Sequence, residues 1–307
     1  MAIAAPSKAA GLTALALGVG ATGFAAIFVR LGDEASPLTL AAYRMLIAGA
    51  VVGAAAGWIA WRRRESLPPA RALVPLAIAS VLLAGHFWSW FASLERTTVG
   101  SSVVIVTMQP LMAAILGYLA FRERPSRAEY IGLALAFVGL VIIGGRDLLH
   151  GDGAFVGDLL ALLGGFLLAA HRTVGRGLRA EMSTEMYSAI VYGGAAVSLW
   201  VIVAVAQPQV SGFAASTWTF IVLLALVPQV IGHTAFNWAL GHFRVVTVSL
   251  ATLGEPVIAT FLAFVILSEA PTVGVLAGGP LILLGVVIGL RGAGVEGAAR
   301  TRAGVRG

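Results

Sequence analysis

Several polar side chains stand in the middle of long apolar runs of this sequence. His86, Trp90 and Ser93 share one face of a helix, because residues three and four apart are neighbours there. His233 and Asn237, four residues apart in a later run, share another face. An aromatic wall with a few hydrogen-bonding groups suits a ligand that has an aromatic ring and a charged amino-acid end, so we predict a cavity lined by these residues. The alternative is that the tryptophan fills a packing position and that each histidine caps a backbone carbonyl of a neighbouring helix.

Glu255 is the most costly of these side chains to bury. It lies about ten residues from either end of its apolar run, and an ionisable group at such a position marks a functional site by default. Its carboxylate could bind a substrate ammonium group, carry a coupling proton, or pair internally with His171, Arg172 or Arg44. The sequence does not choose among these roles. Arg44, itself well inside a run, either extends toward the end of its helix or binds a carboxylate.

Pro110 and Pro256 each stand midway through an apolar run. Inside a helix, proline removes one backbone hydrogen bond and clashes with the carbonyl four residues back, which frees the carbonyls of Val106 and Thr252. Freed carbonyls in an apolar medium must find partners or face a water-filled cavity. We therefore expect both prolines to act as hinges beside the cavity. The alternative is a static kink that packing requires.

The composition places these residues in a membrane. Of the 307 residues, 59% are hydrophobic and only 11% are charged, and the mean hydropathy is +0.94. Soluble domains carry roughly 25% charged residues, so the composition argues against a soluble enzyme, a disordered chain and a nucleic-acid-binding domain. The chain has no cysteine, which excludes disulfides and cysteine metal sites. Phosphate loops and metal-ligand spacings are missing as well, so we expect no cofactor and no metal.

The apolar runs predict an all-α integral membrane protein. A bilayer core about 30 Å thick requires roughly 20 apolar residues per helix. Stretches such as 74–83 and 131–143 do not alternate apolar and polar residues, which argues against a transmembrane β-barrel. We expect ten transmembrane helices around a central cavity. Their expected ranges are 11–31, 38–61, 72–94, 97–121, 128–145, 156–173, 186–206, 217–240, 245–267 and 272–290.

The Lys and Arg residues indicate the orientation of these helices. If the N-terminus is cytoplasmic, 16 of the 20 Lys and Arg residues lie on the cytoplasmic side, 3 lie outside, and Arg44 lies within a span. Cytoplasmic loops are enriched in these residues, so we expect both termini in the cytoplasm. The net charge of +6 then reflects topology and contact with anionic lipid headgroups, and no nucleic-acid partner is required.

The sequence repeats itself, without a gap, at a shift of 146 residues. The shift carries Gln109–Pro110 onto Glu255–Pro256. It also carries Glu123 onto Glu269, Pro125 onto Pro271, Gly139 onto Gly285, and Arg30 onto Arg176. Each unit holds five helices, an odd number, so the second must insert upside down relative to the first, as in many secondary transporters. We expect repeats at 8–148 and 154–294, followed by a cytoplasmic tail at 295–307.

Both halves end in one pattern, which combines a proline within a helix, a Glu-x-Pro-Ser/Thr segment and a glycine-spaced helix. The two copies are Gln109–Ile142 and Glu255–Ile288. With them, the chain resembles the EamA family of the drug/metabolite transporter superfamily over almost its whole length. The segments Gly85–Trp90 and Gly232–Trp238 resemble the aromatic amino-acid exporter branch. The resemblance implies a carrier that exports aromatic and other neutral amino acids across the bacterial inner membrane.

The expected function is therefore secondary export of small metabolites, chiefly aromatic or neutral amino acids, by alternating access and without enzyme activity. One alternative is a multidrug or cationic-metabolite exporter in which Glu255 is the counter-charge. An intramembrane transferase would need clustered His, Asp or Glu residues near one interface, and a channel would not need inverted halves. The expected partners are an amino-acid substrate and membrane lipid. The sequence predicts neither the coupling ion nor the oligomeric state.

Overall fold

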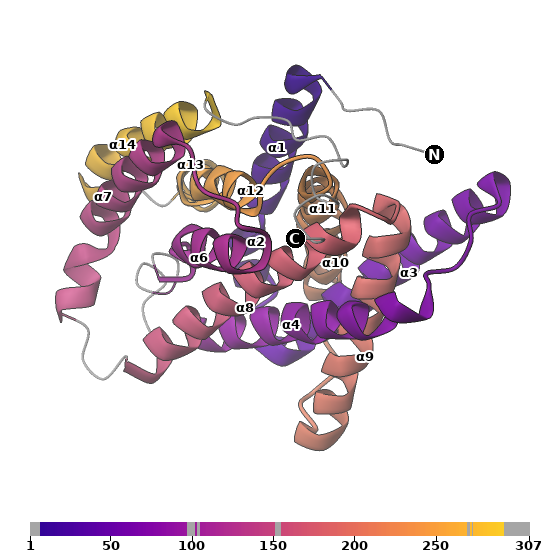
Figure 1. The fold of residues 1–307 in the computed structure, drawn as a ribbon. Coiled ribbons are helices and arrows are strands. Elements are labelled where there is room, and N and C mark those ends of the chain that lie inside the picture. Colours follow the sequence, from indigo (N-terminus) through magenta and orange to yellow (C-terminus); the bar gives the residue numbers. More distant parts are fainter. Residues whose placement is uncertain are drawn as a thin grey trace.

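A computed structural model describes residues 7–96, 102, 105–150, 155–268, 271 and 273–291 of the chain. Every regular element among these residues is a helix (Figure 1). In chain order they are α1 (Lys8–Thr22), α2 (Ala25–Leu31), α3 (Pro37–Arg63), α4 (Ala70–Leu94), α6 (Gln109–Phe121), α7 (Arg127–His150), α8 (Phe155–Arg179), α9 (Thr184–Ala206), α10 (Ala215–Leu224), the π-helix η1 (Ala225–His233), α11 (Thr234–Leu240), α12 (Val245–Ala251), the 3₁₀-helix η2 (Thr252–Gly254), α13 (Glu255–Leu267) and α14 (Val273–Arg291).

Seven helical stretches of the described chain are long and apolar enough to cross a membrane. They are Lys8–Leu31, Pro37–Arg63, Ala70–Leu94, Phe155–Arg179, Thr184–Ala206, Ala215–Leu240 and Val245–Ile266. Two shorter apolar helices are Gln109–Phe121 and Leu276–Arg291. The protein is thus an all-helical, multi-span membrane protein. The start of the expected fourth segment (97–101 and 103–104) and the expected tail (295–307) lie outside the described residues.

Local side-chain bonds fix where several helices begin. Ser36, directly before Pro37, accepts a hydrogen bond from the backbone N–H of Thr39 over 3.2 Å. A proline in the first turn fits there because the start of a helix leaves its N–H groups unpaired. Ahead of α7, Ser126 and Glu129 cap each other's backbone N–H groups over 3.2 and 2.7 Å. This reciprocal pair is a capping box, which sets the first residue of α7.

Several of the expected membrane segments are broken rather than continuous. Gly23 and Phe24 separate α1 from α2, and η2 separates α12 from α13. A turn at Thr107 and Met108 directly precedes α6. Residues beside all three breaks line one cavity, described below. The breaks therefore bring unwound backbone and polar side chains to the same place.

The two candidate hinge residues lie near the starts of helical segments. Pro110 lies in the first turn of α6, and Pro256 is the second residue of α13. Each proline therefore stands in the first turn of a helical segment, where its missing N–H costs little. The carbonyl of Thr252 finds a local partner, because it accepts the backbone N–H of Glu255.

Reciprocal glycine contacts hold α7 against α14. A Cβ atom added at Gly132 would lie 2.4 Å from the carbonyl oxygen of Gly285, and one added at Gly285 would lie 2.5 Å from that of Gly132. A Cβ atom at Gly139 would lie 2.5 Å from the carbonyl oxygen of Gly278. Small residues permit this close approach of two membrane helices. The other extensive helix pairs are α3 with α9 and α4 with α8.

Replacing Gly132 by Ala is expected to destabilise the protein by about 1–3 kcal/mol, because the new methyl group forces α7 and α14 apart. Thermal unfolding in detergent measures this loss. The matched control is Gly53→Ala on α3, where nothing lies within 4 Å of an added Cβ atom. Equal melting temperatures for the two variants would contradict the tight contact between α7 and α14.

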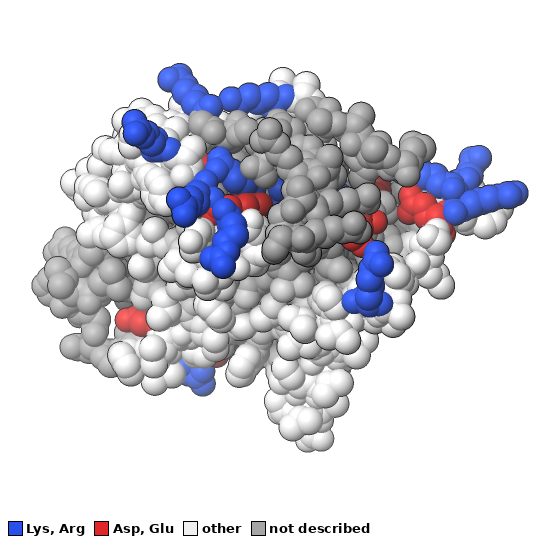
Figure 2. All heavy atoms as spheres, in the orientation of Figure 1, with Lys and Arg blue, Asp and Glu red and all other residues white. Residues whose placement is uncertain are grey.

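The outer surface suits a lipid environment. Large apolar side chains such as Trp61, Val74, Phe155 and Val205 are between 67% and 82% exposed. Water-soluble proteins rarely expose broad apolar patches of this kind. On the face drawn in Figure 2, Lys and Arg side chains gather in the upper half and at the right, and mostly uncharged side chains lie below them. Most of the Lys and Arg side chains visible on this face thus lie in its upper part and at its right edge, with one blue and one red group lower on the left.

Candidate functional site

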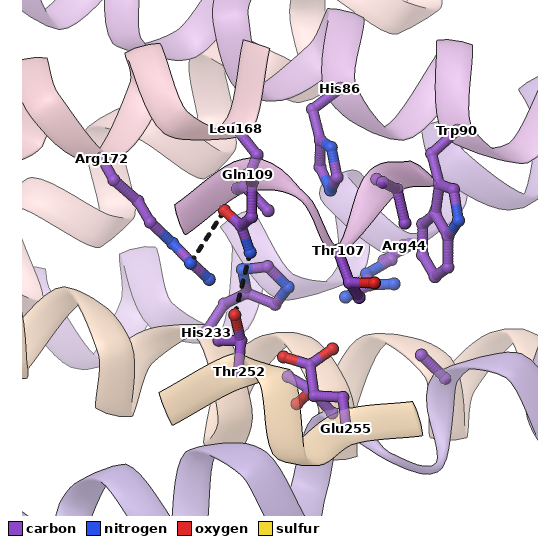
Figure 3. A pocket seen from close by; sticks show the side chains of 13 residues that line it. Arg44, His86, Trp90, Thr107, Gln109, Leu168, Arg172, His233, Thr252 and Glu255 are labelled. Carbon is purple, nitrogen blue, oxygen red and sulfur yellow. Dashed lines mark hydrogen bonds between the residues drawn. The ribbon is translucent and has the colours of Figure 1, made fainter. Parts of the chain in front are cut away.

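A small cavity lies where the broken helices meet. Its volume is about 40 Å³, which is room for a few water molecules, whereas ligand pockets usually have roughly 300–1,000 Å³. Figure 3 shows side chains from both halves of the chain around this space. The lining residues are Thr22, Ala25, Arg44, His86, Trp90, Val106, Thr107, Gln109, Leu168, Arg172, His233, Thr252 and Glu255.

His86, Trp90 and His233 form the ring-bearing part of the lining. The rings of His86 and Trp90 stack with centroids 6.0 Å apart, and His233 packs edge-on to Phe87 at 5.4 Å. His86 Nδ1 lies 2.9 Å from the carbonyl oxygen of Gly164 on α8. Because a carbonyl only accepts, Nδ1 is the donor and Nε2 of the neutral ring remains an acceptor. His86 therefore caps a neighbouring helix and lines the cavity at the same time.

Glu255 lies at the start of α13 and borders the cavity. The positive charges of Arg172 and Arg44, which line the same cavity, favour its ionised form. The N-terminal end of α13 adds a partial positive charge that favours a carboxylate. The third possible partner, His171, instead contacts a backbone carbonyl of α4 over 3.0 Å. The two arginines thus provide the counter-charge.

Arg172 on α8 connects the two helix breaks. Its Nη1 donates to Gln109 Oε1 over 3.0 Å and to Ser249 Oγ over 3.3 Å, and its guanidinium group lies 5.3 Å from the ring centroid of Phe236. Gln109 Nε2 in turn donates to Thr252 Oγ1 over 2.9 Å (Figure 3). Arg172 is buried, so this network joins the start of α6 to η2 without help from bulk water.

Arg44 on α3 is equally buried but less completely paired. Its Nε donates to Gln229 Oε1 over 2.9 Å, and its guanidinium group lies 4.2 Å from the ring centroid of Phe87. Its Nη1 has no hydrogen-bond partner among the described residues, and the same holds for Trp90 Nε1. Two buried donors beside the cavity therefore have unused hydrogen-bonding capacity.

Ser93 and Asn237 do not line the cavity, although helix-face spacing groups them with it. Ser93 Oγ donates to the carbonyl of Trp90 over 2.6 Å and lies 2.6 Å from Ser102 Oγ. Serine in a helix often satisfies itself in this way. Asn237 Nδ2 donates to two hydroxyl groups of α9 over 3.0 and 3.1 Å. Asn237 thus joins α11 to α9, whereas Ser93 bonds within α4 and contacts Ser102.

Several polar residues of the site were not predicted from the sequence as site residues, among them Thr22, Gln109 and Gln229. Gln109 occupies the repeat position of Glu255, so the 146-residue shift carried a signal for it. Gln229 is a polar residue within an apolar run, which by itself marks a candidate. Thr22 carries no such signal, because a threonine in a helix can satisfy its hydroxyl group with a carbonyl of its own helix. The Thr22 hydroxyl group makes such a bond over 2.9 Å.

A second polar cluster ties the α6–α7 loop and the first turn of α7 to the second half of the chain. Arg176 Nε donates to Glu123 Oε1 over 3.2 Å, and both side chains are mostly buried. Glu129 accepts hydrogen bonds from Arg244 Nη2 over 2.6 Å and from Thr247 Oγ1 over 2.5 Å. These bonds connect the two halves at a distance from the cavity lining.

Comparison with known families gives a match to each half of the chain. The family model of the EamA-like transporter family matches residues 9–145 and again residues 155–291. The chain belongs to the EamA-like transporter family. Each bound of the second match lies 146 residues after that of the first, which is the shift found in the sequence. The cavity of this EamA-like transporter is therefore lined by residues from both copies of the family unit.

Several curated proteins are similar to this EamA-like transporter over most of their length. A protein named "Uncharacterized transporter" from Archaeoglobus fulgidus is 26% identical, over 85% of this chain and 91% of its own. A "Probable terminal-alkyne amino-acid exporter" from Streptantibioticus cattleyicolor is 25% identical, over 92% and 93%. A "Probable amino-acid metabolite efflux pump" from Salmonella typhimurium is 25% identical, over 75% and 82%.

A solved crystal structure has the same fold as this EamA-like transporter. It superposes with a TM-score of 0.77 at 20% sequence identity and covers 92% of this chain and 98% of that chain. At this identity the likeness shows the fold alone. Within the described residues no group of three or more His, Asp or Glu side chains is arranged to hold a metal ion.

Proposed function

We propose that this EamA-like transporter is a secondary exporter of aromatic and other neutral amino acids, and that it is not an enzyme. The observation that carries the proposal is the cavity lining, which combines two guanidinium groups, one carboxylate and the rings of His86, Trp90 and His233. This set suits a ligand with charged groups and a ring. The names of two relatives, an amino-acid exporter and an amino-acid metabolite efflux pump, support the same class of substrate.

The proposed architecture is ten transmembrane helices in two inverted repeats, at 8–148 and 154–294. The contacts between α7 and α14 support it, because the 146-residue shift turns Gly132 into Gly278 and Gly139 into Gly285. One glycine contact, Gly132 with Gly285, thereby maps onto the other. A twofold axis produces such reciprocal contacts. With five helices in each unit, that axis lies in the membrane plane.

Alternating access is the proposed mechanism, since the cavity lies between the two copies of the family unit. Broken helices border it from both halves, and the turns before Pro110 and Pro256 are the proposed hinges. A volume of about 40 Å³ is too small for an amino acid. The halves must therefore move apart on one side before a substrate can enter.

The proposed location is the bacterial inner membrane, with both termini in the cytoplasm. The uneven distribution of Lys and Arg along the sequence supports this orientation. Their gathering on one part of the surface in Figure 2 is consistent with it. The cluster of Glu123, Arg176, Glu129 and Arg244 then lies on the cytoplasmic side and joins the repeats there.

A cationic-drug exporter is the second candidate, because Glu255 does border the cavity. Two arginines share the same space, however, so an ionised Glu255 leaves the lining with a net positive charge. A cation without a carboxylate is repelled by that charge. The charge of the lining therefore favours a substrate that brings its own carboxylate.

Purified protein in proteoliposomes is expected to move tryptophan or phenylalanine down a concentration gradient. All amino acids and several cationic drugs are screened with and without a pH gradient, and liposomes without protein are the control. Dependence of the rate on the pH gradient would assign proton coupling. Absence of transport for every amino acid under every gradient would overturn the proposal, and export of cationic drugs alone would select the second candidate.

A further inference from the structure

The cavity holds charges of both signs on three different helices. Arg44 comes from α3, Arg172 from α8 and Glu255 from α13. In Figure 3 the side chains of Arg44 and Glu255 lie around the same space, with Trp90 beside Arg44. The two arginines are not equivalent, because their hydrogen-bonding donors are used differently.

Arg172 uses a donor of its guanidinium group for hydrogen bonds within the protein. Its Nη1 already bridges Gln109 and Ser249, and removing it would also disturb the bond from Gln109 to Thr252. These bonds hold both helix breaks in place. Arg172 therefore has a structural part in the site, and its guanidinium group is the fixed counter-charge of Glu255.

Arg44 differs from Arg172 in the use of its hydrogen-bond donors. Its Nε donates a hydrogen bond to Gln229, and its guanidinium group lies over the ring of Phe87. These two contacts orient the side chain. Its Nη1 is buried without a hydrogen-bond partner among the described residues, and so is Trp90 Nε1. A buried donor without an acceptor is unfavourable, so an acceptor that enters the cavity gains a strong, charge-assisted bond there.

We propose that Arg44 and Glu255 are the specificity-determining pair of this carrier: Arg44 binds the substrate carboxylate through Nη1, and Glu255 binds the substrate ammonium group. This inference rests on the proposed function, and it assigns the residues that bind the two charged ends of the zwitterion. The aromatic or aliphatic side chain then packs against Trp90 and His86. Trp90 Nε1 supplies a second donor for the carboxylate.

The repeat explains why this arrangement accepts a carboxylate. At the position of Glu255, the first repeat carries the neutral Gln109, and the first turn of α6 has no acidic residue. A second carboxylate there would repel that of the substrate. The difference between Gln109 and Glu255 therefore divides a nearly symmetric cavity into an anion-binding side and a cation-binding side.

Removing either charged end of the ligand should consequently abolish recognition. An amine without a carboxylate leaves the donor of Arg44 unused and adds positive charge. An acid without an ammonium group leaves Glu255 with its internal partners only and adds negative charge beside it. Each loss forfeits one charge-assisted hydrogen bond, so we expect at least about a tenfold weaker affinity for either analogue.

The test compares tryptophan, tryptamine and indole-3-propionate as competitors of tryptophan uptake by the wild-type protein in proteoliposomes. Leucine, isoamylamine and 4-methylpentanoate form a second series in case the ring is not the preferred side chain. We expect each amino acid to compete at least about ten times better than its amine or its acid. An amine or acid that competes as well as its amino acid would overturn the inference.

Variants then assign the two ends. Binding to the variants is measured as the rise in melting temperature that each ligand produces in detergent, which needs no transport. Arg44→Gln should weaken binding of tryptophan but not of tryptamine, and Glu255→Gln should weaken binding of tryptophan but not of indole-3-propionate. Arg62→Gln, an exposed change at the end of the same helix as Arg44, is the matched control and should leave all affinities unchanged. If Arg44→Gln weakened tryptophan and tryptamine equally, Arg44 would be a structural residue and the inference would fail.

Failure of this inference differs from failure of the proposed function. If no amino acid is transported by the wild-type protein, the proposed function and the inference both fall. If amino acids are transported but their amines or acids compete equally well, the proposed export of amino acids is retained. The assignment of Arg44 and Glu255 as the specificity-determining pair is then rejected. The wild-type series alone decides this, so the outcome does not depend on whether a variant folds.

Discussion

Replacing Glu129 by Gln is expected to lower the free energy of unfolding by about 3–5 kcal/mol, because it removes one partner of a buried ion pair. The Glu129 carboxylate is fully buried, and Oε2 accepts from Arg244 Nη2 over 2.6 Å. Oε1 accepts from Thr247 over 2.5 Å. A glutamine would turn an N–H₂ group toward one of these donors. Arg244 would then lose the charge that compensates it.

Thermal unfolding in detergent measures the loss at Glu129. The matched control is Glu181→Gln, which removes a carboxylate from an exposed pair with Arg71 at 3.0 Å. That control should cost less than about 1 kcal/mol, since exposed pairs contribute little. A similar melting temperature for the two variants would show that the bonds of Glu129 do not hold the start of α7 against α12.

Much of the fold follows from the sequence, because hydropathy reports the environment of a segment directly. The apolar runs at 38–61, 72–94 and 186–206 correspond to α3, α4 and α9. The breaks do not follow, since the same apolar residues suit a helix, a π-turn or a 3₁₀-turn. The π-helix η1 and the interruption at Gly23 and Phe24 depend on tertiary packing that hydropathy does not report.

The candidate site was predicted in outline. His86, Trp90, His233 and Glu255 line the cavity, because polar and aromatic residues within apolar runs are retained where they have partners. Helix-face spacing failed to place Asn237 at the cavity. Asn237 lies one turn after His233, and there the helix faces α9. Two hydroxyl groups of α9 accept hydrogen bonds from the Asn237 amide. Periodicity gives the direction of a side chain but not which helix stands opposite.

The role of Arg44 required the structure. The sequence allowed two roles for Arg44. Its side chain could extend toward the end of its helix, or it could bind a carboxylate. Its burial, its bond to Gln229 and its unused Nη1 exclude the first role. None of these is visible in the sequence, because Gln229 is 185 positions away.

Replacing Glu255 by Gln is expected to abolish transport and to lower the free energy of unfolding by about 3–5 kcal/mol, because the change leaves Arg44 and Arg172 without a negative partner. Both arginines are buried, and Glu255 is the acidic residue that lines the same cavity as each of them. Uptake of tryptophan by proteoliposomes measures the first effect, and thermal unfolding in detergent measures the second. If the Glu255 carboxyl group were already protonated in the resting protein, glutamine would mimic it. The free energy of unfolding would then hardly change.

A double variant separates charge pairing from a general packing defect. Arg172→Gln in the Glu255→Gln background removes one of the two uncompensated cations. The double variant should therefore be more stable than Glu255→Gln alone by at least about 1 kcal/mol, although Arg172 also binds Gln109 and Ser249. Transport should stay lost, since the proposed site for the substrate ammonium group is still missing. Additive losses from the two changes would mean that Arg172 and Glu255 are not coupled, and the electrostatic account of this cavity would then have to be given up.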